Sequence, residues 1–197
     1  MGIDMNLKKG LTYVAFGFLM TFVSLNVKLK TVSIDILPDF AGWILMFLAY
    51  DQLGDYMKEK KYLKWIPLGM AVISFVWWIL AILNITFDPD YISTIINMAT
   101  ILYFYFLLEV IGKIAADYGS LRVSSIASIR VAMLAGVIIS LLALVLGFFL
   151  DSRYTMFLVI AVMILQVYVT IAAAFDLFLI RKEVTDQLEE KNTESDS

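Results

Sequence analysis

The chain has no cysteine and no histidine among its 197 residues. Without cysteine there is no disulfide and no thiolate ligand, and without histidine the commonest metal ligand and general base is missing. We therefore expect no enzyme, no metal site and no cofactor. Charged residues are also scarce, at 17%, against about 25% in an ordinary soluble domain. The net charge of −3 comes largely from the C-terminus, so nothing indicates a nucleic acid as a partner.

Apolar residues are abundant instead, at 61% of the chain, and they gather in six stretches. Each stretch is close to the roughly 20 residues that cross about 30 Å of hydrocarbon. The stretches are Leu11 to Val27, Ile34 to Tyr50, Ile66 to Phe87, Tyr91 to Leu108, Val131 to Leu150 and Tyr154 to Ile180. The sequence therefore predicts an all-α integral membrane protein with six transmembrane helices. Lipid is its expected environment.

The second stretch is the weakest of the six. Its uncharged part, Phe40 to Tyr50, is only 11 residues long. It crosses the membrane if Asp35, Asp39 and Asp51 lie near the two interfaces, and the alternative is a re-entrant segment. A re-entrant segment would reverse every later span and weaken the charge asymmetry described next, which favours a crossing.

Basic residues are segregated along the chain. Twelve of the 15 lie in segments that share one side of a six-span protein: Lys8, Lys9, Lys58, Lys60, Lys61, Lys64, Lys113, Arg122, Arg130, Arg181, Lys182 and Lys191. Positive charge marks the cytoplasmic side, so both termini are expected there. The short outer turns at 88–90 and 151–153 predict tight pairs, and the six helices would form three antiparallel hairpins.

The hairpins resemble one another weakly, because the returning helix of each carries an acid near its cytoplasmic end: Asp51, Glu109 and Asp176. This pattern suggests a degenerate repeat of the kind found in transporters. The alternative is that helix ends simply tolerate acids. We expect a transmembrane domain over 1–182. The carboxylate-rich segment 183–197 is expected to be mobile and without a fold.

Acids within apolar spans are the sharpest candidates for a site, because a buried carboxylate must be paired, hydrated or protonated. Asp176 is five residues from Arg181, and Glu109 is four from Lys113. One interpretation has Asp51, Glu109 and Asp176 converging on one cytoplasmic-side cavity that binds a cation or proton. The other has each acid paired with a neighbouring lysine or arginine.

Two further acids, Asp35 and Asp39, flank Pro38 on the outer side. Proline suits the first turn of a helix, where the helix dipole also favours a negative charge such as that of Asp39. This structural role needs no ligand. The functional alternative is an acidic outer mouth for a cationic solute, with Lys28 and Lys30 at its rim.

Aromatic and amide side chains near mid-span form a second group of candidates. They are Trp77, Trp78, Tyr103, Tyr105 and Gln166, accompanied by Phe104, Phe106 and Tyr168. Polar tips in lipid need partners, so we expect them to face inward. They would form either ordinary helix packing or a pocket for a small apolar ligand. Small residues at Ala132, Gly136 and Ser140 predict close packing of the fifth span.

One run, Ile34-Asp35-Ile36-Leu37-Pro38-Asp39-Phe40-Ala41-Gly42-Trp43-Ile44-Leu45, resembles a pattern in small, multi-pass, uncharacterised membrane proteins of Gram-positive bacteria. The resemblance implies a bacterial plasma membrane and no particular activity. In size and topology the chain is also similar to the substrate-binding subunits of energy-coupling-factor vitamin transporters. Those subunits dock through a small-residue face on span 1, reduced here to Ala15, Gly17 and Thr21.

Two functions remain open at this stage. The chain binds or transports a small solute or cation through a helix-bundle cavity, or it is a non-catalytic accessory subunit that binds a larger membrane protein. An intramembrane enzyme is disfavoured. Tyr50-Asp51 matches only half of the aspartyl protease signature, the Gly-x-Gly-Asp half is absent, and a serine protease would need a histidine.

Overall fold

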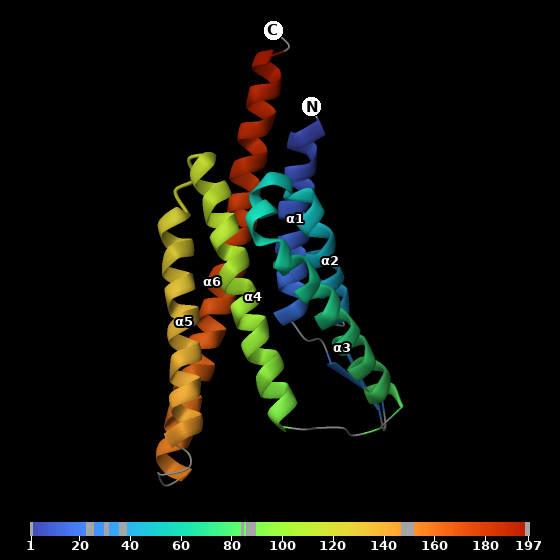
Figure 1. Cartoon of the computed structure of the whole chain (residues 1–197), viewed down its shortest axis with the longest axis vertical. Helices are drawn as coiled ribbons and strands as arrows, with labels where there is room; N and C mark the ends of the chain where they lie inside the picture. Colours follow the sequence, from blue (N-terminus) through green and yellow to red (C-terminus); the bar gives the residue numbers. More distant parts are fainter. Residues whose placement is uncertain are drawn as a thin grey trace. The chain divides into compact units, whose positions relative to one another are not determined.

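A computed structural model describes residues 2–22, 26–29, 32–35, 39–83, 85, 90–146 and 152–195. Its elements are α1 (Gly2–Phe22), β1 (Asn26–Leu29), β2 (Val32–Asp35), α2 (Asp39–Gln52), the 3-10 helix η1 (Gly54–Lys64), α3 (Trp65–Ile82), α4 (Asp90–Asp117), α5 (Val123–Leu146) and α6 (Ser152–Ser195) (Figure 1). The chain is thus mainly α-helical, as predicted, and each of the six apolar stretches overlaps one α-helix.

Four helical segments are long and apolar enough to cross a membrane: Gly54–Ile82, Ile96–Asp117, Val123–Leu142 and Ile160–Glu190. They match the third to sixth predicted spans. Helix α2 has 14 residues, which at 1.5 Å per residue is about 21 Å, less than the roughly 30 Å of hydrocarbon. The first two crossings, the hairpin arrangement and the side on which the termini lie therefore stay predictions.

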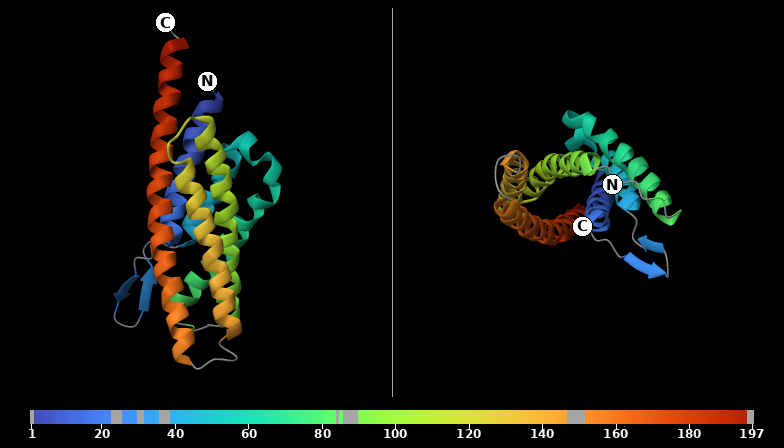
Figure 2. Two further views of the ribbon diagram at one scale, coloured as in Figure 1. Left: turned by 90° about the vertical axis from the view of Figure 1, so that its left-hand side faces the viewer. Right: turned by 90° about the horizontal axis from the view of Figure 1, so that it is seen from below.

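A small antiparallel hairpin separates α1 from α2, and the sequence-based interpretation missed it. Asn26 pairs with Asp35 at its open end, and Leu29 pairs with Val32 beside the turn (Figure 2, blue arrows). Val27 and Ile34, which we assigned to the first two spans, lie in these strands. The signal was present, because apolar and polar residues alternate through both strands with the period of two that indicates β-structure.

The chain divides into two compact units, Met1–Ile96 with Leu177–Ser197, and Asn97–Asp176. In the first unit, α1 and α2 cross closely at Gly17 and Gly42. A Cβ placed on Gly42 would lie 2.7 Å from the Gly17 carbonyl oxygen and 2.5 Å from the Thr21 hydroxyl. Glycine is therefore needed where these helices touch, as in membrane helix pairs generally. Trp43, next to this crossing, is 2% exposed.

The second unit contains parts of α4 and α6 with the whole of α5 between them (Figure 2, left). Helix α4 contributes the bulky buried side chains Tyr103, Phe104 and Leu107. On α5, the position of Gly136 faces α6, since a Cβ built there would be 3.8 Å from the Leu165 side chain. This is an ordinary van der Waals distance, so the especially close packing expected of the small-residue face of α5 stays a prediction.

Large apolar side chains are exposed along α3, α5 and α6. On α6 they are Phe157, Ile160, Met163, Ile164, Val167, Tyr168, Ile171 and Phe175. From Phe157 to Phe175 this surface is about 27 Å long at 1.5 Å per residue, close to the thickness of the hydrocarbon layer. Soluble proteins rarely expose so much contiguous apolar surface, so these faces suit lipid.

Helix α6 continues far beyond its apolar part and ends at Ser195. The prediction that 183–197 has no fold is therefore wrong for residues 183–195. The many charged residues of this segment concealed a periodic apolar face. Its buried residues recur every three or four positions: Ala173, Leu177, Ile180, Val184 and Leu188. That spacing is the one expected for a helix with a single buried stripe.

Candidate functional site

The first of the three predicted cytoplasmic-side acids, Asp51, lies near the end of α2. Its carboxylate accepts a hydrogen bond from Lys64 Nζ at 2.7 Å, and its side chain is 57% exposed. Lys64 also lies over the rings of Phe47 and Tyr50, 5.6 and 5.5 Å from their centroids. This exposed pair joins the end of α2 to the end of η1.

Glu109, on α4, is bound by Arg130 from α5. Nη2 of Arg130 donates to Glu109 Oε2 at 2.9 Å, and its Nε donates to the Tyr105 carbonyl oxygen at 3.2 Å. The guanidinium also lies 4.5 Å from the centroid of the Tyr105 ring. Lys113 Nζ is 4.0 Å from the other carboxylate oxygen, one turn along α4. Arg130 thus contacts a carboxylate, a carbonyl and a ring on one face of α4.

Asp176, on α6, is the most deeply buried of the three acids. Its side chain is 3% exposed, and its Oδ1 lies 3.6 Å from Nη1 of Arg122, which immediately precedes α5. Arg122 is itself 38% exposed and stands 5.8 Å from the centroid of the Phe175 ring. The second oxygen, Oδ2, is buried and has no hydrogen-bond partner among the residues that the structure describes.

Each predicted acid therefore has a different basic partner, as in the ion-pair interpretation. Asp51 belongs to the first unit, whereas Glu109 and Asp176 belong to the second. In the second unit three cations, Lys113, Arg122 and Arg130, accompany the two carboxylates. Within the described part of the chain no three acids are grouped as metal ligands would be.

The two acids predicted on the outer side, Asp35 and Asp39, lie in different elements of the backbone. Asp39 occupies the first turn of α2, as the helix-dipole interpretation predicted, and is half-buried. Asp35 ends β2 instead of entering the second span. The side chains of Asp35 and Lys28, and the whole of Pro38 and Lys30, lie outside what the structure describes, so the acidic outer mouth stays a prediction.

The aromatic candidates of the first unit lie on α3. Trp77 and Trp78 are both half-buried. Trp78 meets Phe40 of α2 edge to face at 5.6 Å between centroids, and its ring is stacked with Phe75 at 6.4 Å. Phe40 and Phe75 are themselves 5.2 Å apart. This cluster joins α2 to α3 by ordinary aromatic packing.

The aromatic candidates of the second unit divide between buried and exposed positions. Tyr103 is 2% exposed and makes an edge contact with Phe104 at 5.3 Å, so its expected inward orientation is confirmed. Tyr105 lies under the guanidinium of Arg130. Gln166 is exposed, and Tyr168 is 67% exposed. The inward orientation is wrong for these two, because α6 is open on both of the sides on which they lie in this chain.

The sequence-based interpretation named Lys113 as a neighbour of Glu109 but missed the arginine partners of Glu109 and Asp176. It used Arg122 and Arg130 only as indicators of topology. Their spacing held a usable signal, because they stand at and just inside the start of α5, after a short turn from α4. An antiparallel neighbour places such residues beside the end of the preceding helix, where Glu109 lies.

No family profile, no curated protein and no solved structure matches this chain. Its class therefore follows from its own residues: a helical protein with four helices long and apolar enough to cross a membrane. Its most unusual polar group is the carboxylate of Asp176, which is buried and only half satisfied.

Proposed function

We propose that the chain is a multi-pass protein of the bacterial plasma membrane that binds or transports a small polar solute at Asp176. The observation that carries this proposal is the buried Oδ2 of Asp176, which has no partner within the described residues. An ionisable residue within an apolar span costs several kcal/mol unless it is paired, and it commonly marks a solute or proton pathway.

The contacts of Asp176 support a hydrogen-bonding solute. Arg122 approaches only Oδ1, at 3.6 Å, which holds the carboxylate without satisfying it. An unsatisfied buried acceptor costs about 1 to 3 kcal/mol. A hydroxyl or amine of a solute donating to Oδ2 would recover that energy. Binding of a solute would therefore offset the free-energy cost of burying Oδ2 without a hydrogen bond.

The expected topology indicates on which side of the membrane the site lies. Lys8 of α1 pairs with Glu189 of α6 at 2.8 Å, which brings the two end regions of the chain together within the first unit. Both carry basic residues, the mark of the cytoplasmic face. Asp176 is five residues before Arg181, so we place the solute near the cytoplasmic end of the apolar part of α6.

The variant Asp176→Asn tests the proposal, because it keeps the shape and removes the carboxylate. Gentle extraction and native mass spectrometry of the wild-type chain should show a retained small molecule, which the variant loses together with uptake. Asp186→Asn, at an exposed acid on the same helix, is the matched control and should behave as wild type. Retention of the same molecule by Asp176→Asn would refute the proposal.

An accessory role is the second candidate, and the ion pairs favour it. Arg122 with Asp176 and Arg130 with Glu109 both join helices, which is a structural role that needs no solute. In that case native mass spectrometry would show a stoichiometric protein complex without a small molecule. Asp176→Asn would then weaken the complex. An uptake assay would show no uptake for the wild type or for the variant.

A further inference from the structure

An open pocket of about 380 Å³ lies along the first half of α1, in the first unit. The described residues that line it are Lys8, Lys9, Thr12 and Tyr13. Two of these carry positive charge, two carry hydroxyl groups, and none is acidic. Most of the exposed surface of the pocket is nevertheless apolar, so the site combines two positive charges with a carbon-lined wall. A phosphate group attached to an apolar chain suits this combination, and phosphate is the commonest anion at a membrane surface.

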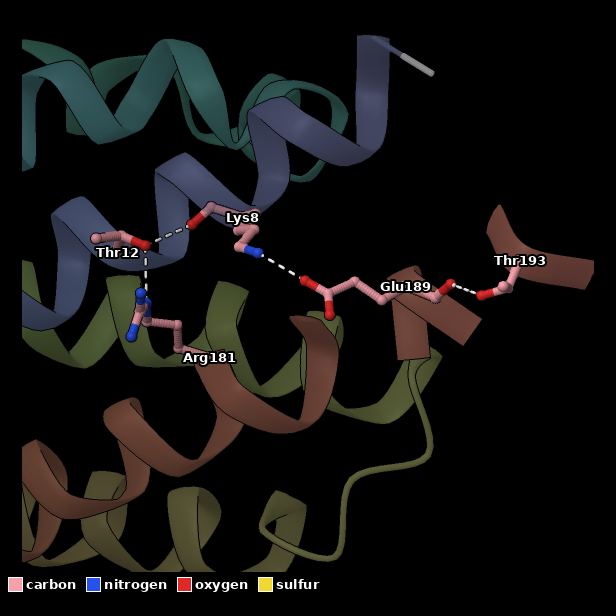
Figure 3. A network of polar contacts seen from close by, with 5 residues as sticks. All are labelled: Lys8, Thr12, Arg181, Glu189 and Thr193. Carbon is pink, nitrogen blue, oxygen red and sulfur yellow. Dashed lines mark hydrogen bonds and ion pairs between the residues drawn. The ribbon is translucent and has the colours of Figure 1, made fainter. Parts of the chain in front are cut away.

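Arg181 of α6 bonds to Thr12, one of the residues that line this pocket (Figure 3). Its Nε donates to Thr12 Oγ1 at 2.8 Å, and the same hydroxyl donates to the Lys8 carbonyl oxygen at 2.7 Å. The hydroxyl is thereby used as both acceptor and donor. Among the described residues no partner lies at the two terminal nitrogens of Arg181, although the side chain is half-buried. A fixed guanidinium with free N–H groups is well suited to bind phosphate oxygens.

Lysine charge at the pocket is only partly neutralised. Lys8 pairs with Glu189 at 2.8 Å, and in the same close-up Glu189 also accepts a hydrogen bond from Thr193 at its carbonyl oxygen. Lys9 is exposed and has no acid partner within the described chain. Counting only the side chains that the structure describes, three cations, including Arg181, accompany one carboxylate, and their balance of charge is positive.

Below the pocket, the same face of α1 becomes apolar. Phe16 and Leu19 follow Lys9 and Thr12 by two turns each, and they are 44% and 36% exposed. Phe16 meets Phe178 of α6 edge to face at 5.4 Å, so the seam between these two helices continues past the pocket. A cationic site at the end of an exposed apolar stripe matches the shape of a phospholipid, with its headgroup above and its acyl chain along the helix.

We propose that Arg181 and Lys9 form a binding site for a phosphate group, supplied by the headgroup of an anionic phospholipid. This site lies in the first unit and does not depend on the solute proposed at Asp176. A soluble phosphate compound offers the same chemistry from a different source. The apolar stripe of Phe16 and Leu19 favours the lipid.

The full chain in a neutral detergent provides the test. Phosphatidylglycerol is titrated and followed by native mass spectrometry, and inorganic phosphate is titrated by calorimetry. We expect one tightly retained phosphatidylglycerol per chain. Arg181→Gln should weaken its binding at least about tenfold, since a charge-assisted phosphate contact is worth 1.4 kcal/mol or more. Lys182→Gln, an equal charge change at the exposed neighbour, should stay within about twofold of wild type.

Lys9→Gln separates binding from folding, because this exposed side chain has no hydrogen bond or ion pair with the side chains that the structure describes. It should weaken phosphatidylglycerol binding while the thermal unfolding temperature is unchanged. Binding of inorganic phosphate alone, lost in Arg181→Gln, would replace the lipid by a soluble phosphate as the occupant. Equal losses in Arg181→Gln and Lys182→Gln, or no binding of either probe, would overturn the site.

Discussion

At the scale of single residues, Arg130 makes the most varied set of contacts in the second unit. Its guanidinium bonds to a carboxylate and a carbonyl of α4 and covers the Tyr105 ring. Lysine could replace the charge, but it cannot reproduce the planar fork that makes these contacts together. The geometry of the guanidinium, and not its charge alone, joins α4 to α5.

Replacing Arg130 by glutamine should lower the free energy of unfolding by about 1 to 3 kcal/mol, because Glu109 loses its closest cation. Arg130→Lys should recover only part of this loss. Reversible unfolding in mixed micelles measures both variants. The matched control is Lys58→Gln, which breaks an ion pair whose side chains are 71% and 83% exposed; such a pair contributes at most about 1 kcal/mol. Equal effects of Arg130→Gln and Lys58→Gln would contradict the structural role of Arg130.

At the scale of elements, the crossing of α1 and α2 depends on glycine. Gly17 and Gly42 let the two backbones meet, and Thr21 donates its hydroxyl to the Gly17 carbonyl at 2.8 Å. Gly17 and Thr21 belong to the small-residue face that resembles a docking surface for another protein. In this chain that face is occupied by α2.

Alanine at position 42 should separate the helices, because its Cβ would meet backbone atoms of Gly17 and Thr21 at 2.7 and 2.9 Å. We expect Gly42→Ala to lower the free energy of unfolding by about 1 to 3 kcal/mol. Gly69→Ala on α3 is the control, since nothing lies within 4 Å of its Cβ position. That change should be neutral or stabilise the helix by up to about 1 kcal/mol. A stabilising Gly42→Ala would show that the helices do not cross as described.

At the scale of the whole molecule, the distribution of basic residues predicts six crossings, whereas length and composition identify four helices able to cross. The difference concerns α1 and the 14-residue α2. If α2 were re-entrant, η1 and every later loop would change sides. The side on which Lys61 lies therefore decides between the two topologies.

Labelling of single cysteines can decide this directly, because the native chain has no cysteine. With a membrane-impermeant maleimide on intact cells, we expect Asp90→Cys to react and Lys61→Cys and Lys113→Cys to be protected. Disruption of the cells should make all three reactive. Labelling of Lys61→Cys from outside would reject the six-span topology and favour a re-entrant α2.

Composition and periodicity alone predicted the helical class, the six apolar segments and the acids that need partners, because these depend on hydropathy and on local residue spacing. Local patterns also indicated the strand pair at Val27 and Ile34, which the neighbouring apolar runs concealed, and the extension of α6 past Val184, which charge concealed. Only the tertiary structure decided that Arg122 pairs with Asp176 and that Arg130 pairs with Glu109. It also decided that Gly42 lets α2 approach α1 closely. Such contacts join residues far apart along the chain. A short turn between two helices can indicate that they are neighbours, but only their packing decides which side chains meet. The same packing left Oδ2 of Asp176 unsatisfied and the terminal nitrogens of Arg181 free among the described residues.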